Sequence, residues 1–243
     1  MSENSGRTVV VTGGSRGIGL AIAARFAAQG WTVVACAPLC LEGLDDLIAT
    51  HPSVTFVPLD LTDVASVKAC AQSIVKDHAR IDALINVAGI ALGGLFSMTR
   101  IEDMKRVFDV NYFNQIVLTQ YLAKKMVRAK AGSIVNIAST AGLRADAGTL
   151  AYGGSKAALI HATGVMATEL GPFGIRVNAI APSVVQTPMA AEMDDTSKAA
   201  LDARSALPGT VEASNVADLV EFLVSDASAK MTGQVIRLDR GLH

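Results

Sequence analysis

A tyrosine and a lysine four residues apart, Tyr152 and Lys156, are the side chains in this sequence best suited to transfer a proton. In a helix this spacing puts both side chains on one face. Tyrosine has an ordinary pKa of about 10, so it is a poor base at neutral pH unless a cation stabilises the phenolate. Lys156 is placed to supply that cation. The same spacing also occurs by chance on solvated helix faces, so the pair alone does not establish a site.

Ser139 adds a second function to this pair. It follows an apolar run at 133–137, and its hydroxyl is suited to hydrogen-bond a carbonyl oxygen and to hold the oxyanion as hydride arrives. The three side chains suit reversible hydride transfer between a secondary alcohol and a ketone, with Tyr152 exchanging the proton on oxygen. His161 lies about 180° around the same helix from Tyr152, so we expect it to point away as a packing or interface residue.

A glycine-rich stretch at 12–19, Thr-Gly-Gly-Ser-Arg-Gly-Ile-Gly, separates a β-branched run from an alanine-rich segment with helical spacing. Glycines permit a sharp turn and the close approach of a pyrophosphate, and the positive end of the following helix favours its charge. The spacing Gly-x-x-x-Gly-x-Gly is not the commoner Gly-x-Gly-x-x-Gly, so an ordinary tight turn is the alternative. Gly30 is placed to end the helix, and Trp31 is interpreted as packing rather than as a ligand contact.

The elements that would position these residues are apolar runs alternating with segments of helical periodicity. Because several runs are apolar throughout, they suit strands that are covered on both faces. The predicted fold is a single-domain α/β Rossmann fold, a doubly wound, seven-stranded parallel sheet with helices on both faces. Ligands of such sheets bind beyond the carboxyl ends of the strands. The predicted strands are 8–11, 32–37, 54–59, 83–86, 133–137, 176–180 and 235–238.

Polar or small residues follow several of these predicted strands. Asp60 is interpreted either as an adenine contact or as a turn former, with Thr62 capping a helix that begins near Asp63. The Asn-Val-Ala-Gly sequence at 86–89 is either a backbone approach to a bound ring or a plain turn. A long helix is predicted at 101–130. The lysines and the arginine at its C-terminal end suit the helix dipole, and we expect them to face water rather than to bind nucleic acid.

Bulk properties narrow the classes of function. The 243 residues are 51% hydrophobic with a net charge of -1, which suits one domain over 1–243 and gives no bias towards nucleic acid or a membrane. Three cysteines without paired metal-ligand spacing predict a reduced, cytoplasmic protein with no metal site. The polar N-terminus and the lack of a long apolar run fit this interpretation.

Taken together, the motifs resemble the short-chain dehydrogenases/reductases, and the likeness covers nearly the whole chain. It rests on 12–19, Asp60, 86–89, Asn111, Ser139, the Tyr-Gly-Gly-Ser-Lys sequence at 152–156 and the Pro-Ser-Val-Val-Gln-Thr sequence at 182–187. The resemblance implies that Tyr152 is the acid/base and that Lys156 lowers its pKa and binds the nicotinamide ribose. It also implies that Ser139 positions the carbonyl, and that Asn111 supports a water-linked proton path to Lys156.

The resemblance further implies a nicotinamide cofactor, a small carbonyl or alcohol substrate and a homotetramer built through the long helices that carry Asn111 and Tyr152. A protein that binds nicotinamide as a silent sensor or scaffold is the alternative, and a sugar-nucleotide epimerase is disfavoured by the short chain after Asn215. The implied cofactor contacts are Gly13, Ser15, Arg16, Gly17, Ile18, Gly19, Asp60, Leu61, Asn86, Ala88, Gly89, Tyr152, Lys156, Pro182, Val185 and Thr187.

Three positions depart from the family pattern. Val87 stands where a second asparagine is common, Ser183 replaces the glycine after Pro182, and Arg240 replaces the first glycine of Asp-Gly-Gly. After the second strand, neither Ala37 nor its neighbours offer an acid for ribose hydroxyls or a base for a 2′-phosphate. Arg16 is the nearest candidate partner for that phosphate, so NADP(H) is favoured over NAD(H), which remains possible.

The substrate pocket is expected at 141–149, with Val184, Met189 and Met193, beneath a candidate lid at 186–207. Arg144 is the one conspicuous charge in this set. It is interpreted either as a partner for an anionic group of the substrate or as a solvated loop residue, and the neighbouring Asp146 weakens the first interpretation.

Overall fold

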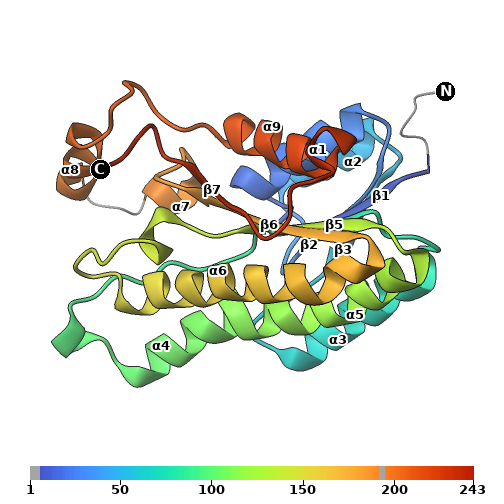
Figure 1. Ribbon diagram of the computed structural model, residues 1–243, viewed down its shortest axis with the longest axis horizontal. Helices are drawn as coiled ribbons and strands as arrows, with labels where there is room; N and C mark the ends of the chain where they lie inside the picture. Colours follow the sequence, from blue (N-terminus) through green and yellow to red (C-terminus); the bar gives the residue numbers. More distant parts are fainter. Residues whose placement is uncertain (1–5, 192–194) are drawn as a thin grey trace.

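The apolar runs form one parallel sheet in the computed structural model, which describes residues 6–191 and 195–243 (Figure 1). Within these residues seven strands pair in the order β3-β2-β1-β4-β5-β6-β7. This confirms the predicted doubly wound sheet. The strands are β1 (Thr8–Thr12), β2 (Thr32–Ala37), β3 (Val54–Pro58), β4 (Ala83–Asn86), β5 (Gly132–Ile137), β6 (Ile175–Pro182) and β7 (Val235–Leu238).

Helices cover both faces of the sheet, as Figure 1 shows. On one face lie α1 (Gly17–Ala28), α2 (Glu42–Thr50) and α9 (Ala213–Val224). The other face carries α3 (Val64–Asp77), α4 (Ile101–Phe108), α5 (Asn114–Ala129) and α6 (Leu150–Leu170). The short elements are α7 (Pro188–Ala191), α8 (Asp195–Ala203), the π-helical turn η2 (Asp109–Phe113) and the 3-10 turns η1 (Phe96–Met98), η3 (Thr140–Gly142), η4 (Gly171–Phe173) and η5 (Asp226–Ser228).

The strand order reverses between β1 and β4, because β1 pairs in parallel with β2 on one side and with β4 on the other. Thr12 ends β1 and Asn86 ends β4, so the glycine-rich turn and the 86–89 loop leave the sheet side by side. A doubly wound sheet binds its ligand at such a reversal. The topology therefore brings the two predicted cofactor loops together.

Apolar side chains fill a separate core on each face of the sheet. A series of buried polar side chains crosses the core on the face covered by α3, α5 and α6. In it the Asn86 amide donates to Thr119 Oγ1 at 3.0 Å and to Asn136 Oδ1 at 2.9 Å. Asn136 donates in turn to Thr163 Oγ1 at 2.8 Å. Such hydrogen bonds are needed because an unpaired buried amide costs about 1–3 kcal/mol. They hold β4 and β5 to α5, which carries Thr119, and to α6, which carries Thr163 and the predicted catalytic residues Tyr152 and Lys156.

Some local predictions change in the structure. The helix predicted at 101–130 is interrupted by η2, whose π-helical geometry contains Asn111. The cap of α3 is Asp63, which accepts from the N–H groups of Ala65 and Ser66, so the prediction for Thr62 was wrong. The Thr62 hydroxyl instead donates to Asp60.

Two packing predictions can be compared with the structure. Trp31 is buried against Phe26, with the ring centroids 5.0 Å apart, as expected of a packing residue. His161 is exposed on α6. Among the described helices, none is long and apolar enough to cross a membrane.

Candidate active site

The glycine-rich turn is shaped by contacts that exclude side chains. A Cβ atom on Gly19 would lie 2.1 Å from the carbonyl oxygen of Gly13, and Gly17 has a φ of +54°. The turn leads into α1, whose N-cap residue Arg16 makes no side-chain capping hydrogen bond, and whose first turn contains no acid. The first N–H groups of α1 are therefore left for an external anion, which fits the pyrophosphate of a nicotinamide cofactor.

Thr12 joins this turn to the loop that follows β4. Its Oγ1 accepts hydrogen bonds from Val87 N at 2.9 Å and from Ala88 N at 3.1 Å. A Cβ on Gly13 would lie 3.1 Å from the backbone of Ala88, so the two loops are in direct contact. Sequence reasoning did not assign this role to Thr12, although the residue lies within the glycine motif.

Gly89 lies where the predicted cofactor loops meet two of the predicted catalytic residues. A Cβ at this position would lie 3.1 Å from Asn111 Oδ1 and 3.5 Å from Lys156 Nζ. Lys156 is buried, and its ammonium donates to the carbonyl oxygen of Ile137 at 2.8 Å. The fold thus brings Asn111 and Lys156 to the end of the loop at 86–89.

Asn111 lies in the π-helical turn, and three hydrogen bonds join its side chain to residues outside that turn. Its Oδ1 accepts from Ile90 N at 2.8 Å, and its Nδ2 donates to Ile90 O at 2.9 Å and to Ser155 Oγ at 3.0 Å. Ser155 donates to the carbonyl oxygen of Tyr152 at 2.7 Å. Ser155 is a positioning residue that sequence reasoning missed. Its place one residue before Lys156 was the available signal.

Ser139 reaches Tyr152 because the turn after β5 packs directly on α6. A Cβ on Gly142 would lie 2.8 Å from the backbone of Lys156, and one on Gly153 would lie 2.6 Å from the carbonyl oxygen of Ala141. Ser139 lies close enough to Tyr152 to act on the pKa of the phenol, and its Oγ accepts from Ala141 N at 3.2 Å. The Lys156 ammonium lies 5.9 Å from the centre of the Tyr152 ring. The fold therefore brings the four predicted catalytic residues to one end of the sheet.

Burial sets the protonation of the pair. It lowers the pKa of Lys156 to about 8, and it raises the pKa of Tyr152, which the nearby Ser139 acts to lower. We expected Lys156 to lower the pKa of Tyr152, and the net shift is in the opposite direction. The reason is that burial disfavours the charged phenolate.

Other predicted cofactor contacts lie around this centre. The segment after β6 reaches the glycine turn, because a Cβ on Gly17 would lie 3.3 Å from Thr187 Cγ2. The side chains of Leu61, Asn86 and Val185 face the interior, so these three residues present backbone rather than side chain to a ligand. Pro182 and Ser15 are buried, Ile18 and Ala88 are half-buried, and Arg16 is exposed.

Asp60 lies at the end of β3, where it forms the turn that was one of its two interpretations. Its Oδ1 accepts from Thr62 N at 2.8 Å, and these hydrogen bonds with Thr62 lower the pKa of the carboxyl group. This turn leaves the second carboxylate oxygen of Asp60 for another contact.

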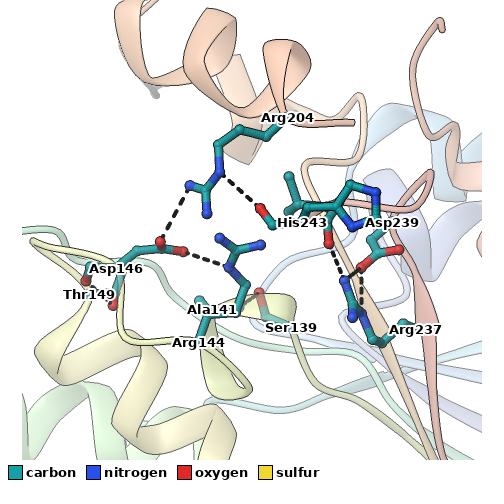
Figure 2. Close-up of polar contacts among 10 residues, drawn as sticks. Ser139, Ala141, Arg144, Asp146, Thr149, Arg204, Arg237, Asp239 and His243 are labelled. Atoms are coloured by element: carbon teal, nitrogen blue, oxygen red, sulfur yellow. Dashed lines mark hydrogen bonds and ion pairs between the residues drawn. The ribbon is translucent and has the colours of Figure 1, made fainter. Parts of the chain in front are cut away.

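Arg144 belongs to a chain of charged residues beside the site (Figure 2). Its Nε lies 3.4 Å from Asp146, which also lies 3.6 Å from Arg204. The Arg144 side chain is 19% exposed, so it is neither freely solvated nor an uncommitted anion site. Met193, expected in the pocket, lies outside the described residues.

The chain is similar in sequence to known oxidoreductases over nearly its whole length. Residues 13–243 match a family model described as enoyl-(acyl carrier protein) reductase. A 3-oxoacyl-(acyl-carrier-protein) reductase, FabG of Thermotoga maritima, is 35% identical over 241 residues, 98% of each chain. L-xylulose reductase of Mus musculus is 37% identical over 98% of this chain and 96% of its own. Meso-2,3-butanediol dehydrogenase of Serratia marcescens is 32% identical over 97% of this chain and 94% of its own.

Solved structures are similar over nearly the whole length. A short-chain type dehydrogenase/reductase from Mycobacterium ulcerans superposes with a TM-score of 0.91 at 29% identity, covering 98% of this chain and 90% of its own. A protein described as a short chain dehydrogenase/reductase family protein gives a TM-score of 0.87 at 32% identity over 98% of both chains.

Proposed function

Because this chain belongs to the short-chain dehydrogenase/reductase family, and so is a nicotinamide-dependent oxidoreductase of ketones and secondary alcohols, we propose that Tyr152 is its acid/base residue. The observation that carries the proposal is the buried Lys156 ammonium 5.9 Å from the centre of the Tyr152 ring, with the turn that follows Ser139 packed on the same helix. With its pKa raised above the ordinary value of about 10, the phenol is protonated at neutral pH, which suits donation of its proton to a substrate oxygen. The Ser139 hydroxyl holds that oxygen as negative charge develops.

Lys156 and Asn111 complete the site. The Lys156 ammonium lies over the Tyr152 ring and offsets the negative charge left after the tyrosine has given up its proton. Asn111 faces Lys156 across Gly89, and its amide holds Ile90 and Ser155, which position the loop and the helix on either side. We assign Asn111 to the support of a proton path that restores the phenol.

When bound, the nicotinamide cofactor donates or accepts the hydride. The glycine turn and the α1 N-terminus would hold its pyrophosphate, and the loop at 86–89 with Lys156 would hold the nicotinamide ribose. Pro182, Val185 and Thr187 would contact the carboxamide end, and Asp60 with Leu61 the adenine end. Arg16 is exposed at the start of α1, and a charge-assisted contact with a 2′-phosphate favours NADP(H) over NAD(H).

The main test is Tyr152→Phe, which removes the transferable proton and keeps the ring. We expect kcat for ketone reduction to fall by at least about 10²-fold, while the Kd for NADPH stays within about twofold. A panel of a 3-oxoacyl thioester, a pentulose and a small diketone follows the substrates named for the relatives. Turnover undiminished in the variant contradicts the proposal. Tight cofactor binding without turnover of any ketone by the wild type favours the silent sensor or scaffold.

Cofactor choice is tested separately. Arg16→Ala should reduce kcat/KM with NADPH by about tenfold and leave that with NADH nearly unchanged, because only NADPH carries the extra phosphate. Arg16→Lys serves as the control that keeps the charge. An unchanged NADPH/NADH ratio in Arg16→Ala would remove Arg16 from this role.

We further propose that residues 1–243 form one domain that assembles as a homotetramer in the cytoplasm. The long helices α5 and α6 would form the interface, and Val165 on α6 is a large apolar side chain that is 43% exposed. The three cysteines are free thiols, which supports a reducing compartment. Light scattering of the purified protein tests the assembly.

A further inference from the structure

Arg240 has an unusual backbone conformation for its residue type. Among the described residues, the non-glycine positions with positive φ are Lys130, at +51°, and Arg240, at +58°. This left-handed region is unfavourable for a side chain with a Cβ atom. Arg240 also stands where the family pattern has glycine, which adopts the region freely. An unfavourable conformation of this kind persists when surrounding contacts hold it in place.

The guanidinium of Arg240 provides such contacts to residues 202–210, which we call the return limb. One terminal nitrogen donates to the carbonyl oxygens of Leu207, at 3.2 Å, and Gly209, and the other pairs with the carboxylate of Asp202. The backbone adds a hydrogen bond from Leu207 N to Arg240 O at 3.0 Å. The Arg240 side chain is only 14% exposed, so these contacts are partly shielded from water.

The chain end that carries Arg240 is itself firmly held (Figure 2). Asp239 is buried and accepts from Arg237 Nε at 2.6 Å and from Gly241 N at 3.1 Å. Arg237 also donates to the carbonyl oxygen of Leu242. Arg240 therefore extends from a fixed base at the end of β7, and the return limb is the part that it restrains.

The return limb leads back to the candidate active site. Its end is followed by Val211, which bridges to Val185, and Gln186 N donates to Val211 O at 2.9 Å. Val185 and Gln186 immediately precede Thr187. The Thr187 side chain lies against the glycine turn, because a Cβ on Gly17 would lie 3.3 Å from its Cγ2. Displacement of the return limb would thus be transmitted to the segment at 185–187, which we propose to contact the carboxamide end of the cofactor.

A second link joins the return limb to the loop after Ser139. Arg204 lies 3.6 Å from Asp146, and its Nε donates to the backbone oxygen of His243 at 2.9 Å (Figure 2). The backbone of His243 donates in return to Arg204 O at 3.2 Å. Two arginines therefore join the limb to the chain end, Arg204 from the limb and Arg240 from the chain end. Arg204 also connects the limb to the expected substrate loop.

We propose that Arg240 is a positioning residue that fixes the return limb, and through it the segment at 185–187 and the substrate loop. The proposal rests on the proposed function for its effect on catalysis, but the restraint itself is a property of the fold. Arg240 touches none of the catalytic residues. Its loss is expected to loosen substrate and cofactor binding and to leave the proton-transfer step intact.

Arg240→Gly tests this in the full-length protein, because glycine accepts the backbone conformation and only the guanidinium is lost. Hydrogen exchange should be at least about tenfold faster in peptides from the return limb and unchanged in peptides from β6, because only local opening is promoted. KM for the ketone should rise by about threefold or more while kcat stays within about twofold. Arg240→Lys keeps the charge but loses the planar guanidinium with its several N–H donors. It should therefore be intermediate in both hydrogen exchange and KM.

Lys130→Gly is the matched control, because it removes the other left-handed non-glycine residue at the end of α5. It should leave exchange in the return limb and KM unchanged. Unchanged exchange in Arg240→Gly would overturn the proposal, as would faster exchange throughout the molecule. Both outcomes are measured without turnover, so they are independent of the Tyr152→Phe result. Faster exchange confined to the limb with an unchanged KM would overturn the catalytic part.

Discussion

The side-chain amide of Asn111 pairs in both directions with the backbone of Ile90, accepting from its N–H at 2.8 Å and donating to its carbonyl oxygen at 2.9 Å. The pairing satisfies both backbone groups of a residue that belongs to no strand or helix. It holds the loop after β4 to the π-helical turn, next to Lys156. A residue assigned by resemblance to a proton path thus also fixes the loop that we propose to hold the nicotinamide ribose.

Asn111→Ala should therefore reduce both stability and activity. Leaving the two backbone groups of Ile90 unpaired should cost about 2–4 kcal/mol of unfolding free energy, and kcat should fall at least about tenfold. Urea unfolding and steady-state kinetics measure the two effects.

Asn178→Ala is the matched control. Asn178 is a buried amide on β6 that donates to Met231 O at 2.9 Å and accepts from Gln234 N at 3.1 Å. It should lose comparable stability with kcat nearly unchanged. An equal loss of kcat in both variants would reduce the role of Asn111 to general stability.

Lys156→Met should separate stability from function. Burial lowers the pKa of Lys156 to about 8, against about 10.4 in an unfolded chain. The folded state therefore carries a cost for the charged form that is fully present below pH 8 and disappears as pH rises towards 10.4. Removing the charge should raise the free energy of unfolding by roughly 3 kcal/mol, because the desolvation cost of the ammonium is relieved. The lost hydrogen bond to Ile137 O should lower it again by about 1 kcal/mol.

The variant should accordingly be inactive yet about 2 kcal/mol more stable than the wild type at pH 7. Its advantage should shrink as pH rises from 8 to 10, and chemical unfolding at a series of pH values follows this difference. A constant difference across that range would contradict a depressed lysine pKa.

Gly19→Ala tests the cradle formed by the glycine turn. The added methyl group would lie 2.1 Å from the carbonyl oxygen of Gly13, so the turn must move, and we expect the affinity for NADPH to fall by at least about tenfold. Fluorescence titration measures this. In Gly171→Ala the methyl group meets nothing within 4 Å, and the variant should bind normally and gain about 0.5 kcal/mol. Normal binding by Gly19→Ala would contradict the assignment.

The raised pKa of Tyr152 predicts opposite pH profiles for the two directions. Reduction uses the protonated phenol, so its kcat/KM should be flat near neutral pH and fall in the alkaline range. Alcohol oxidation requires the phenolate, so its kcat/KM should rise with pH over the same range. Profiles that change in the same direction would show that another group controls the proton.

The sequence by itself determined the framework. Seven short apolar, β-branched runs separated by helical segments predict a buried parallel sheet, because such strands must be covered on both faces. The spacing of Tyr152 and Lys156 likewise determines a shared helix face, since helical geometry is local. Both inferences depend on periodicity, which a single sequence records.

The tertiary structure alone decided which distant groups meet and what burial does to them. The bonds from Asn111 to Ile90, and from Arg240 to Leu207, join residues far apart in the chain, and neither residue type specifies its partner. The interruption of the predicted helix by η2 accompanies the first of these bonds. Burial likewise governs the pKa of Tyr152, because desolvation depends on every neighbour that the fold brings near.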